Sequence, residues 1–315
     1  VMEAWEATGA EAATATFPTI HTSAGTVRGV RLDGASQYLG MRFATSARFE
    51  PPVDFTGRYA NGTHDGTDFG RACMQVGAAP NVTYGSEDCL VANVWQPAGA
   101  RPGDRLPVLV FIYGGSWQFG ETEPYNGSAL AAKHGVVYAA LAYRTGPLGF
   151  MAFEEDAAAG RATGNWGMQD MQAGLRWLRR EVAAFGGDPR RLTIHGQSSG
   201  GMAVELHHVM PASRGLLHGI VSESGGLSAR PLKMALANTH TAAQAVGCAN
   251  TITTTTDSGS ASTTKACMQR VAAVALTSQT YSLSFEPTVD GVVIPSDPLA
   301  LLRRGAINPG VGFLA

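Results

Sequence analysis

The sequence has little excess charge of either sign, few cysteines and no long apolar run. Its 23 Lys and Arg residues nearly balance 25 Asp and Glu residues, which gives a net charge of −2 over 315 residues. This balance excludes a strongly basic nucleic-acid binder and a disordered polyelectrolyte. The longest apolar runs, such as Val108–Ile112, are far shorter than the roughly 20 residues that span a bilayer. The composition predicts a soluble α/β or mixed protein with a sizeable core.

The beginning of the sequence carries no targeting pattern. It starts at Val1, and no basic segment followed by an apolar segment precedes the body. We therefore expect either that a signal peptide has been removed or that the chain is a fragment. Residues 1–16, rich in Ala, Thr and Glu, predict a loose leader, and residues 17–315 predict the folded domain.

The four cysteines match no metal-site spacing, because the sequence has no CxxC and no pair of histidines near the cysteines. Cys73 with Cys89, and Cys248 with Cys267, would each close a short loop, while the alternative is four buried thiols. Three glycosylation triplets favour the disulfides, although such triplets also arise by chance. They are Asn61-Gly-Thr63, Asn81-Val-Thr83 and Asn126-Gly-Ser128. Together the two signals predict an oxidising compartment, and thus secretion.

Apolar strands and amphipathic helices alternate along the chain. Strands are predicted at Thr22–Val30, Tyr38–Phe43, Leu106–Tyr113, Gly135–Tyr143, Leu192–Gly196 and Gly219–Ser222. Helices are predicted at Asn165–Phe185, Gly200–Val209, Leu232–Val246 and Lys265–Leu276, and polar loops at 48–80 and 251–264. This alternation is typical of an α/β fold with a largely parallel sheet.

The segment Gly196–Gly200 (GQSSG) fits the G-x-S-x-G pattern. The pentapeptide alone is weak, but here it joins a predicted buried strand to a predicted helix, which is the context of a nucleophile elbow. The helix amino terminus would direct free N–H groups at the reacting oxygen beside Ser198. The alternative is a tight strand-to-helix turn without chemistry.

A second glycine turn, Tyr113–Ser116 (YGGS), follows a buried strand upstream. Glycines there let backbone N–H groups point at a substrate oxygen, and with the amide of Ser199 they would form an oxyanion hole. The alternative for this pair of glycines is an ordinary turn.

Several distinctive blocks come in an order that resembles the type-B carboxylesterase/cholinesterase family. They are Glu87–Leu90 (EDCL), Tyr113–Gly115 (YGG), Tyr143–Phe150 (YRTGPLGF), Gly164–Asp170 (GNWGMQD), Phe185–Pro189 (FGGDP) and Gly196–Gly200. The resemblance runs from about Thr22 to the last residue. It implies an α/β-hydrolase fold, with helices on both faces of a central sheet, and an acyl-transfer site.

The resemblance also implies roles for single residues. Ser198 would be the nucleophile, with oxyanion donors at Gly115, Ser116 and Ser199. The resemblance also pairs Cys73 with Cys89 and Cys248 with Cys267. It implies buried ion pairs of Arg48 with Glu87 and of Arg144 with Asp170, Ser224 as a serine behind the catalytic acid, and Tyr281 and Leu283 in the acyl pocket.

The sequence departs from the family pattern near the predicted nucleophile. Ser116 replaces the third glycine of the usual triplet, although its amide is still available. Gln197 replaces the glutamate that precedes the nucleophile, and the loop between Cys73 and Cys89 has no Trp for stacking on a choline cation. These departures argue against a true cholinesterase.

The triad order in this fold is Ser, then an acid, then His. By resemblance, Gly310–Ala315 is the strand just before the acid, so the acid and the His are expected beyond Ala315. The sheet would then be truncated before its last strands and the domain incomplete at its carboxyl end. All eight histidines are expected to be structural or exposed; they are His21, His64, His134, His195, His207, His208, His218 and His240.

The favoured hypothesis is a secreted serine carboxylesterase acting on a small-molecule ester through an acyl-enzyme at Ser198. This mechanism needs no cofactor and no metal, and no nucleic-acid or membrane partner is expected. The 315 residues alone would be inactive if the acid and the His lie beyond them. The alternatives are a non-catalytic binding or adhesion module and a truncated pseudo-enzyme.

Overall fold

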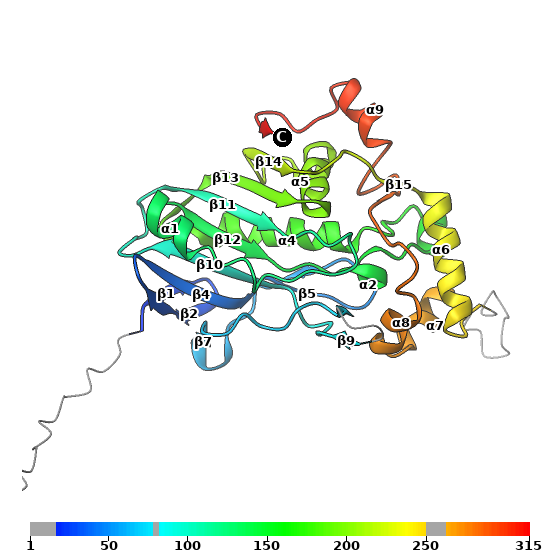
Figure 1. Ribbon diagram of the computed structural model, residues 1–315, viewed down its shortest axis with the longest axis horizontal. Coiled ribbons are helices and arrows are strands. Elements are labelled where there is room, and N and C mark those ends of the chain that lie inside the picture. Colours follow the sequence, from blue (N-terminus) through cyan, green and yellow to red (C-terminus); the bar gives the residue numbers. More distant parts are fainter. Residues whose placement is uncertain (1–16, 78–81, 250–262) are drawn as a thin grey trace, which may run out of the picture.

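The computed structural model describes residues 17–77, 82–249 and 263–315, built around an eight-stranded sheet (Figure 1). The strand order is β17-β14-β13-β11-β12-β10-β4-β3. The bounds are β3 Val30–Leu32, β4 Ala35–Arg42, β10 Val91–Pro97, β11 Leu106–Ile112, β12 Val137–Leu141, β13 Gly187–Gln197, β14 Gly219–Glu223 and β17 Gly312–Leu314. The predicted leader, residues 1–16, lies outside the described residues.

The sheet is mixed. The pairs from β12 through β11, β13 and β14 to β17 are parallel. The pairs β12–β10, β10–β4 and β4–β3 are antiparallel. The predicted α/β class is confirmed, and the parallel pairing is confined to the half of the sheet that carries β11 and β13.

The remaining strands form small sheets beside the main one. They are β1 Thr19–Thr22, β2 Gly25–Arg28, β5 Ala44–Thr45, β6 Val53–Asp54, β7 Thr63–Asp65, β8 Gln75–Val76, β9 Thr83–Tyr84, β15 Arg230–Pro231 and β16 Thr288–Val289. The single strand predicted at Thr22–Val30 is wrong. The chain reverses between β1 and β2, where Gly25 has a φ of 134° that only glycine adopts freely.

The helices connect the strands. They are α1 Ser128–His134, α2 Gly146–Phe150, α3 Glu154–Ala158, α4 Trp166–Glu181, α5 Ser199–Val209, α6 Leu232–Ala245, α7 Thr264–Arg270, α8 Ala273–Gln279 and α9 Pro298–Arg303. Short 3₁₀ turns occur at Ala60–Gly62, Val182–Phe185 and Pro211–Ser213. No helix among the described residues is long and apolar enough to cross a membrane.

Helices cover both faces of the main sheet (Figure 1). Gly174 of α4 lies so close to Leu141 that an added Cβ would stand 2.7 Å from a leucine methyl. Gly127, at the start of α1, lies against the ring of Tyr138 in the same way. Because side chains alternate along β12, Leu141 and Tyr138 point to opposite faces, and so α4 and α1 lie on opposite sides.

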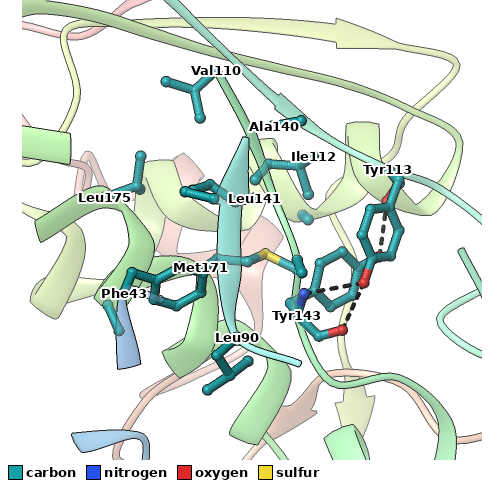
Figure 2. Close-up of a cluster of buried hydrophobic side chains, with 14 of the residues drawn as sticks. Phe43, Leu90, Val110, Ile112, Tyr113, Ala140, Leu141, Tyr143, Met171 and Leu175 are labelled. Atoms are coloured by element: carbon teal, nitrogen blue, oxygen red, sulfur yellow. Dashed lines mark hydrogen bonds between the residues drawn. The ribbon is translucent and has the colours of Figure 1, made fainter. Parts of the chain in front are cut away.

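The core beneath α4 is a cluster of buried hydrophobic side chains (Figure 2). At its edge, Tyr113 and Tyr143 stack with ring centres 4.2 Å apart. The Tyr113 hydroxyl donates to the Tyr143 carbonyl at 2.7 Å, and the Tyr143 hydroxyl donates to the Tyr113 carbonyl at 2.8 Å. Burial raises the pKa of both phenols well above the usual value, so both stay neutral donors. The pair fixes the chain at the carboxyl ends of β11 and β12.

One predicted helix is interrupted. The residues predicted as one helix, Lys265–Leu276, form α7 and α8 with a break at Val271. The Arg48 guanidinium donates to the carbonyls of Met268, Gln269 and Val271. It thereby satisfies carbonyl groups that end the helix, which helical periodicity does not reveal.

The covalent and ionic links expected from the family resemblance are confirmed. Both disulfides are formed, Cys73–Cys89 and Cys248–Cys267. Arg144 donates to Asp170 through two side-chain bonds of 2.8 Å, and both side chains are buried. Arg48 donates to Glu87 at 2.8 Å, but this pair is only partly buried because 36% of the Glu87 side chain is exposed.

Candidate active site

Ser198 occupies the sharp turn between β13 and α5. Its φ of 57° and ψ of −126° lie outside the regions that serine ordinarily adopts. Its N–H donates to the Glu223 carbonyl at 2.8 Å, and its carbonyl accepts the N–H of Met202 at 2.9 Å. The strained turn is therefore held from both sides, by β14 and by the first turn of α5.

The glycines of the pentapeptide are required by close backbone packing. A Cβ on Gly196 would stand 2.5 Å from the Gly200 carbonyl and 2.7 Å from the Ile112 oxygen. A Cβ on Gly200 would overlap the Ile112 oxygen and stand 2.8 Å from the Tyr113 oxygen. Strand β11, strand β13 and helix α5 thus meet where no side chain fits, which is the reason the sequence pattern has glycine at these two positions.

The turn after β11 runs through three consecutive residues with positive φ: Gly115 at 120°, Ser116 at 54° and Trp117 at 65°. A Cβ on Gly115 would overlap the carbonyl oxygen of Phe119. The N–H of Trp117 donates to Ser199 Oγ at 3.3 Å, which ties this turn to the helix after the elbow. Within the described residues, the N–H groups of Gly115, Ser116 and Ser199 have no acceptor, as an oxyanion hole requires.

Polar side chains from distant segments hold this glycine turn. Gln75, which is 1% exposed, donates to the carbonyls of Gly120 at 2.9 Å and Cys73 at 3.0 Å. It also accepts the Gly120 N–H at 2.8 Å. Gln118 donates to the Phe285 carbonyl at 2.8 Å. No sequence pattern pointed to Gln75, because its partners lie two residues and 45 residues away.

A pocket of about 630 Å³ opens over the two turns. It is lined by Ser198 with Gly114, Gly115 and Ser116, and further out by Gln75, Tyr84, Phe119, Glu121, Tyr125 and Gln197, among others. Its volume is in the range of small-molecule sites. The structure thus brings together the predicted nucleophile and two of the three predicted donor residues, while Ser199 is buried just behind them.

The side chains of neighbouring polar residues surround the turn, although one of these residues, Glu223, also accepts the Ser198 N–H through its backbone carbonyl. Gln197 is exposed and lines the pocket as a neutral amide. Glu223 approaches His195, with Oε1 3.6 Å from Nδ1, and burial lowers the pKa of His195. Ser224 is exposed and has a φ of 52°. It directly follows β14, whose last residue, Glu223, accepts the Ser198 N–H through its carbonyl.

All eight histidines lie in the described part of the chain, and none of them lines the pocket at Ser198. His207 is fully buried, its Nδ1 lies 2.8 Å from Ser213 Oγ, and burial lowers its pKa to about 4. His208 packs near Phe313 instead. A neutral imidazole enclosed in the core has a structural role, as predicted for this helix.

The two predicted acyl-pocket residues are separated. Tyr281 is exposed and lines a second cavity that adjoins the main pocket. Leu283 packs against the hydrophobic core and lines neither cavity. A metal site is not formed either: the described residues contain no group of three or more His, Cys, Asp or Glu side chains that could hold an ion.

Comparison with known proteins agrees with this geometry. A model of the carboxylesterase family matches residues 16–313. Bile salt-activated lipase of Rattus norvegicus is 33% identical over 94% of this chain and 51% of its own length. Cocaine esterase of Oryctolagus cuniculus is 39% identical over 66% of this chain and 42% of its own. The chain therefore spans about half the length of the bile salt-activated lipase that it matches.

Solved structures give the same result. A thermophilic PNB esterase superposes with a TM-score of 0.80 at 29% identity, covering 95% of this chain and 62% of its own. A carboxylesterase of Geobacillus stearothermophilus superposes with a TM-score of 0.79 at 30% identity, covering 94% and 60%. The α/β-hydrolase fold implied by the sequence resemblance is confirmed.

Proposed function

The chain belongs to the carboxylesterase family, and we propose that the whole protein hydrolyses carboxylic esters with Ser198 as the nucleophile. The observation that carries the proposal is the strained backbone at Ser198, beside a pocket that is also lined by Gly115 and Ser116. Relatives named as esterases and a lipase support the same class of reaction. The substrate class is a small-molecule carboxylic ester.

In the proposed reaction, Ser198 Oγ attacks the ester carbonyl carbon while its proton passes to a general base. The carbonyl oxygen becomes an oxyanion that accepts the N–H groups of Gly115, Ser116 and Ser199. The bond to the alcohol then breaks, the alcohol leaves with a proton, and a water molecule hydrolyses the acyl-serine. Each preorganised donor lowers the barrier by about 3 kcal/mol.

The general base comes from outside these 315 residues in this proposal. All eight histidines are accounted for, and none lines the pocket of Ser198. Without a base, a serine hydroxyl is a weak nucleophile. Residues 1–315 alone should therefore hydrolyse esters far more slowly than the natural full-length protein.

The surrounding residues would select and support the substrate. Gln197 presents a neutral amide to the pocket, so it offers no charge to a cationic alcohol group. The family resemblance assigns Tyr281 and Leu283 to the acyl pocket and Ser224 to a place behind the catalytic acid. Of the two acyl-pocket residues, only Tyr281 lines a cavity beside Ser198.

Secretion and glycosylation form part of the proposal. Two disulfides are consistent with an oxidising compartment. Asn61 and Asn126 are exposed, and the Asn126 oxygen accepts the Ser128 N–H at 2.8 Å, leaving its amide nitrogen available for a glycan. The third triplet, at Asn81, lies outside the described residues. A shift in mass on peptide:N-glycosidase treatment of the secreted protein would test this part.

The experiment that tests the function is covalent labelling of the natural full-length protein with a fluorophosphonate. We expect a single adduct on the peptide that contains Ser198, together with loss of hydrolysis of p-nitrophenyl butyrate. Ser198→Ala should abolish both, whereas Ser296→Ala, at a serine that does not line the pocket, should leave both unchanged. A folded full-length protein without adduct or turnover would refute the proposal and favour a binding module.

A further inference from the structure

A second cavity lies beside the pocket of Ser198, and one of its lining residues is Tyr281, which the family resemblance assigns to the acyl pocket. Its volume is about 380 Å³. It is lined by Val76, Gly77, Gln118, Phe119, Pro147, Thr277 and Tyr281. The cavity is large enough for part of a small organic ligand.

Phe119 stands between this cavity and the main pocket. Together with Val76 and Gly77, it lines both spaces, so these three residues form their common wall. The Phe119 N–H donates to the Gly115 carbonyl at 3.2 Å. A Cβ on Gly115 would stand 2.9 Å from a carbon of the Phe119 ring, so the ring lies directly against the predicted oxyanion turn.

The second cavity is chemically unlike the first. Its described lining has no charged side chain, and the Gln118 amide is already committed to the Phe285 carbonyl at 2.8 Å. The main pocket, in contrast, is lined by the Glu121 carboxylate and the Gln197 amide. The hydroxyls of Thr277 and Tyr281 are the other polar side-chain groups that line the second cavity. A hydrocarbon group would gain from leaving water in the second cavity.

The wall is not anchored in the core. Phe119 is 52% exposed, which is unusual for a phenylalanine that borders two cavities. Its backbone is fixed by Gly115 and its ring lies against that glycine, but the ring is not packed on all sides as core side chains are. Removing the ring would join the two spaces without opening a hole in the core.

We propose that Phe119 is a specificity-determining residue, whose ring controls the passage of a linear alkyl chain of the ester from the Ser198 pocket into the second cavity. The proposal rests on the proposed ester hydrolysis. The alkyl chain belongs to the acyl half or to the alcohol half of the substrate, since both halves are attached to the carbonyl carbon that Ser198 attacks. The chemistry that the cavity recognises is the same in either case.

The test measures kcat/KM of the natural full-length protein over two series of substrates. One series is p-nitrophenyl alkanoates from acetate to dodecanoate, and the other is acetates of linear alcohols of matching lengths. Phe119→Ala should raise the ratio of long-chain to short-chain kcat/KM about tenfold in one series, because added methylenes reach apolar space. Thr277→Phe, which fills the second cavity from a residue that does not line the main pocket, should lower that ratio about tenfold.

Controls separate the outcomes. Phe17→Ala removes a similarly exposed phenylalanine that lines neither cavity, and it should leave the ratio unchanged. Thr277→Met fills less space and replaces Thr277→Phe if the larger side chain lowers the melting temperature. A shift in the alkanoate series identifies the acyl half, and a shift in the alcohol series identifies the alcohol half. Unchanged ratios in both series, with hydrolysis intact, overturn the inference about Phe119.

A binding measurement keeps the inference independent of turnover. Calorimetry with dodecanoate should show about tenfold weaker binding to the Thr277→Phe protein than to the wild-type protein. Equal affinities would overturn the role of the cavity even in a protein that hydrolyses nothing. Absence of hydrolysis in the wild-type protein, with the affinity difference present, would instead refute the proposed function alone.

Discussion

Two turns lie side by side at the pocket, and each holds a serine at a left-handed φ, 57° at Ser198 and 54° at Ser116. The first turn is held by backbone packing against β11, where even a methyl group on Gly200 would overlap a carbonyl oxygen. The second is closely packed at Gly115 as well, and a distant side chain also holds it, since Gln75 bonds both the N–H and the carbonyl of Gly120.

The comparison shows two ways to keep a reactive turn in a strained conformation. Backbone contacts leave no freedom at single positions, so the residue types there are fixed. Side-chain hydrogen bonds depend in addition on a distant partner that is nearly fully buried. We therefore expect the elbow to be intolerant of small changes within it, and the upstream turn to be sensitive at Gln75 as well as at its glycines.

The largest effect is expected for Gly200→Ala. The added methyl group overlaps the Ile112 oxygen and approaches the Tyr113 oxygen to 2.8 Å, and neither backbone atom can move without separating β11 from α5. The free energy of unfolding should fall by about 3 kcal/mol or more. Urea unfolding followed by circular dichroism measures it.

Gly312→Ala is the matched control for that change. The nearest atom to its added Cβ, the His218 oxygen, is 3.9 Å away, which is ordinary contact. Its stability should change by less than about 1 kcal/mol. Similar losses for the two variants would mean that close packing is not what fixes the elbow.

A smaller effect, shared between stability and rate, is expected for Gln75→Leu. Leucine has a similar size but leaves the buried N–H of Gly120 without its 2.8 Å acceptor. The free energy of unfolding should fall by about 2 kcal/mol, the cost of an unsatisfied buried donor. The glycine turn would also shift, so kcat/KM for p-nitrophenyl butyrate should drop about tenfold.

The control is Gln96→Leu, at a residue equally buried but with one long bond of 3.5 Å to the Ala100 carbonyl. Its side-chain oxygen has no partner among the described residues, so removing the amide should cost less than about 1 kcal/mol and leave the rate unchanged. A Gln75 variant that loses stability at full rate would show that other contacts fix the turn.

The same contrast explains what the sequence could predict. The elbow was predictable because its requirements are local: glycines at Gly196 and Gly200, a buried strand before and a helix after. The reciprocal bonds of Tyr113 and Tyr143, and the Gln75 clamp, join residues 30 and 45 positions apart. No pattern within one element encodes such contacts, so periodicity could not reveal them.

Fold elements follow the same division. The strand at Leu106–Tyr113 and the helix at Asn165–Phe185 were predicted closely, because long apolar or periodic segments carry their own signal. The break after α7 was missed, because it depends on Arg48, about 220 residues earlier in the chain. The second cavity was likewise beyond prediction, since its lining comes from β8, α2, α8 and the loops beside them.

The smallest effect is expected for Ser116→Gly, because only the amide of this residue enters the proposed oxyanion hole. Its φ of 54° costs a non-glycine residue about 1 kcal/mol, which glycine relieves. Glycine also makes the unfolded chain more flexible, a cost of similar size, so stability should change by less than about 1 kcal/mol. Because the N–H stays, kcat/KM should stay within about threefold of wild type, against the hundredfold or more that follows the loss of a donor.

Arg105→Gly, at a φ of 55° outside the pocket, is the control for the backbone contribution, and equal stability changes in the two variants would assign that change to φ alone. A loss of activity beyond tenfold in Ser116→Gly would show that the serine side chain itself holds the upstream turn or the substrate, and that the two turns are equally intolerant.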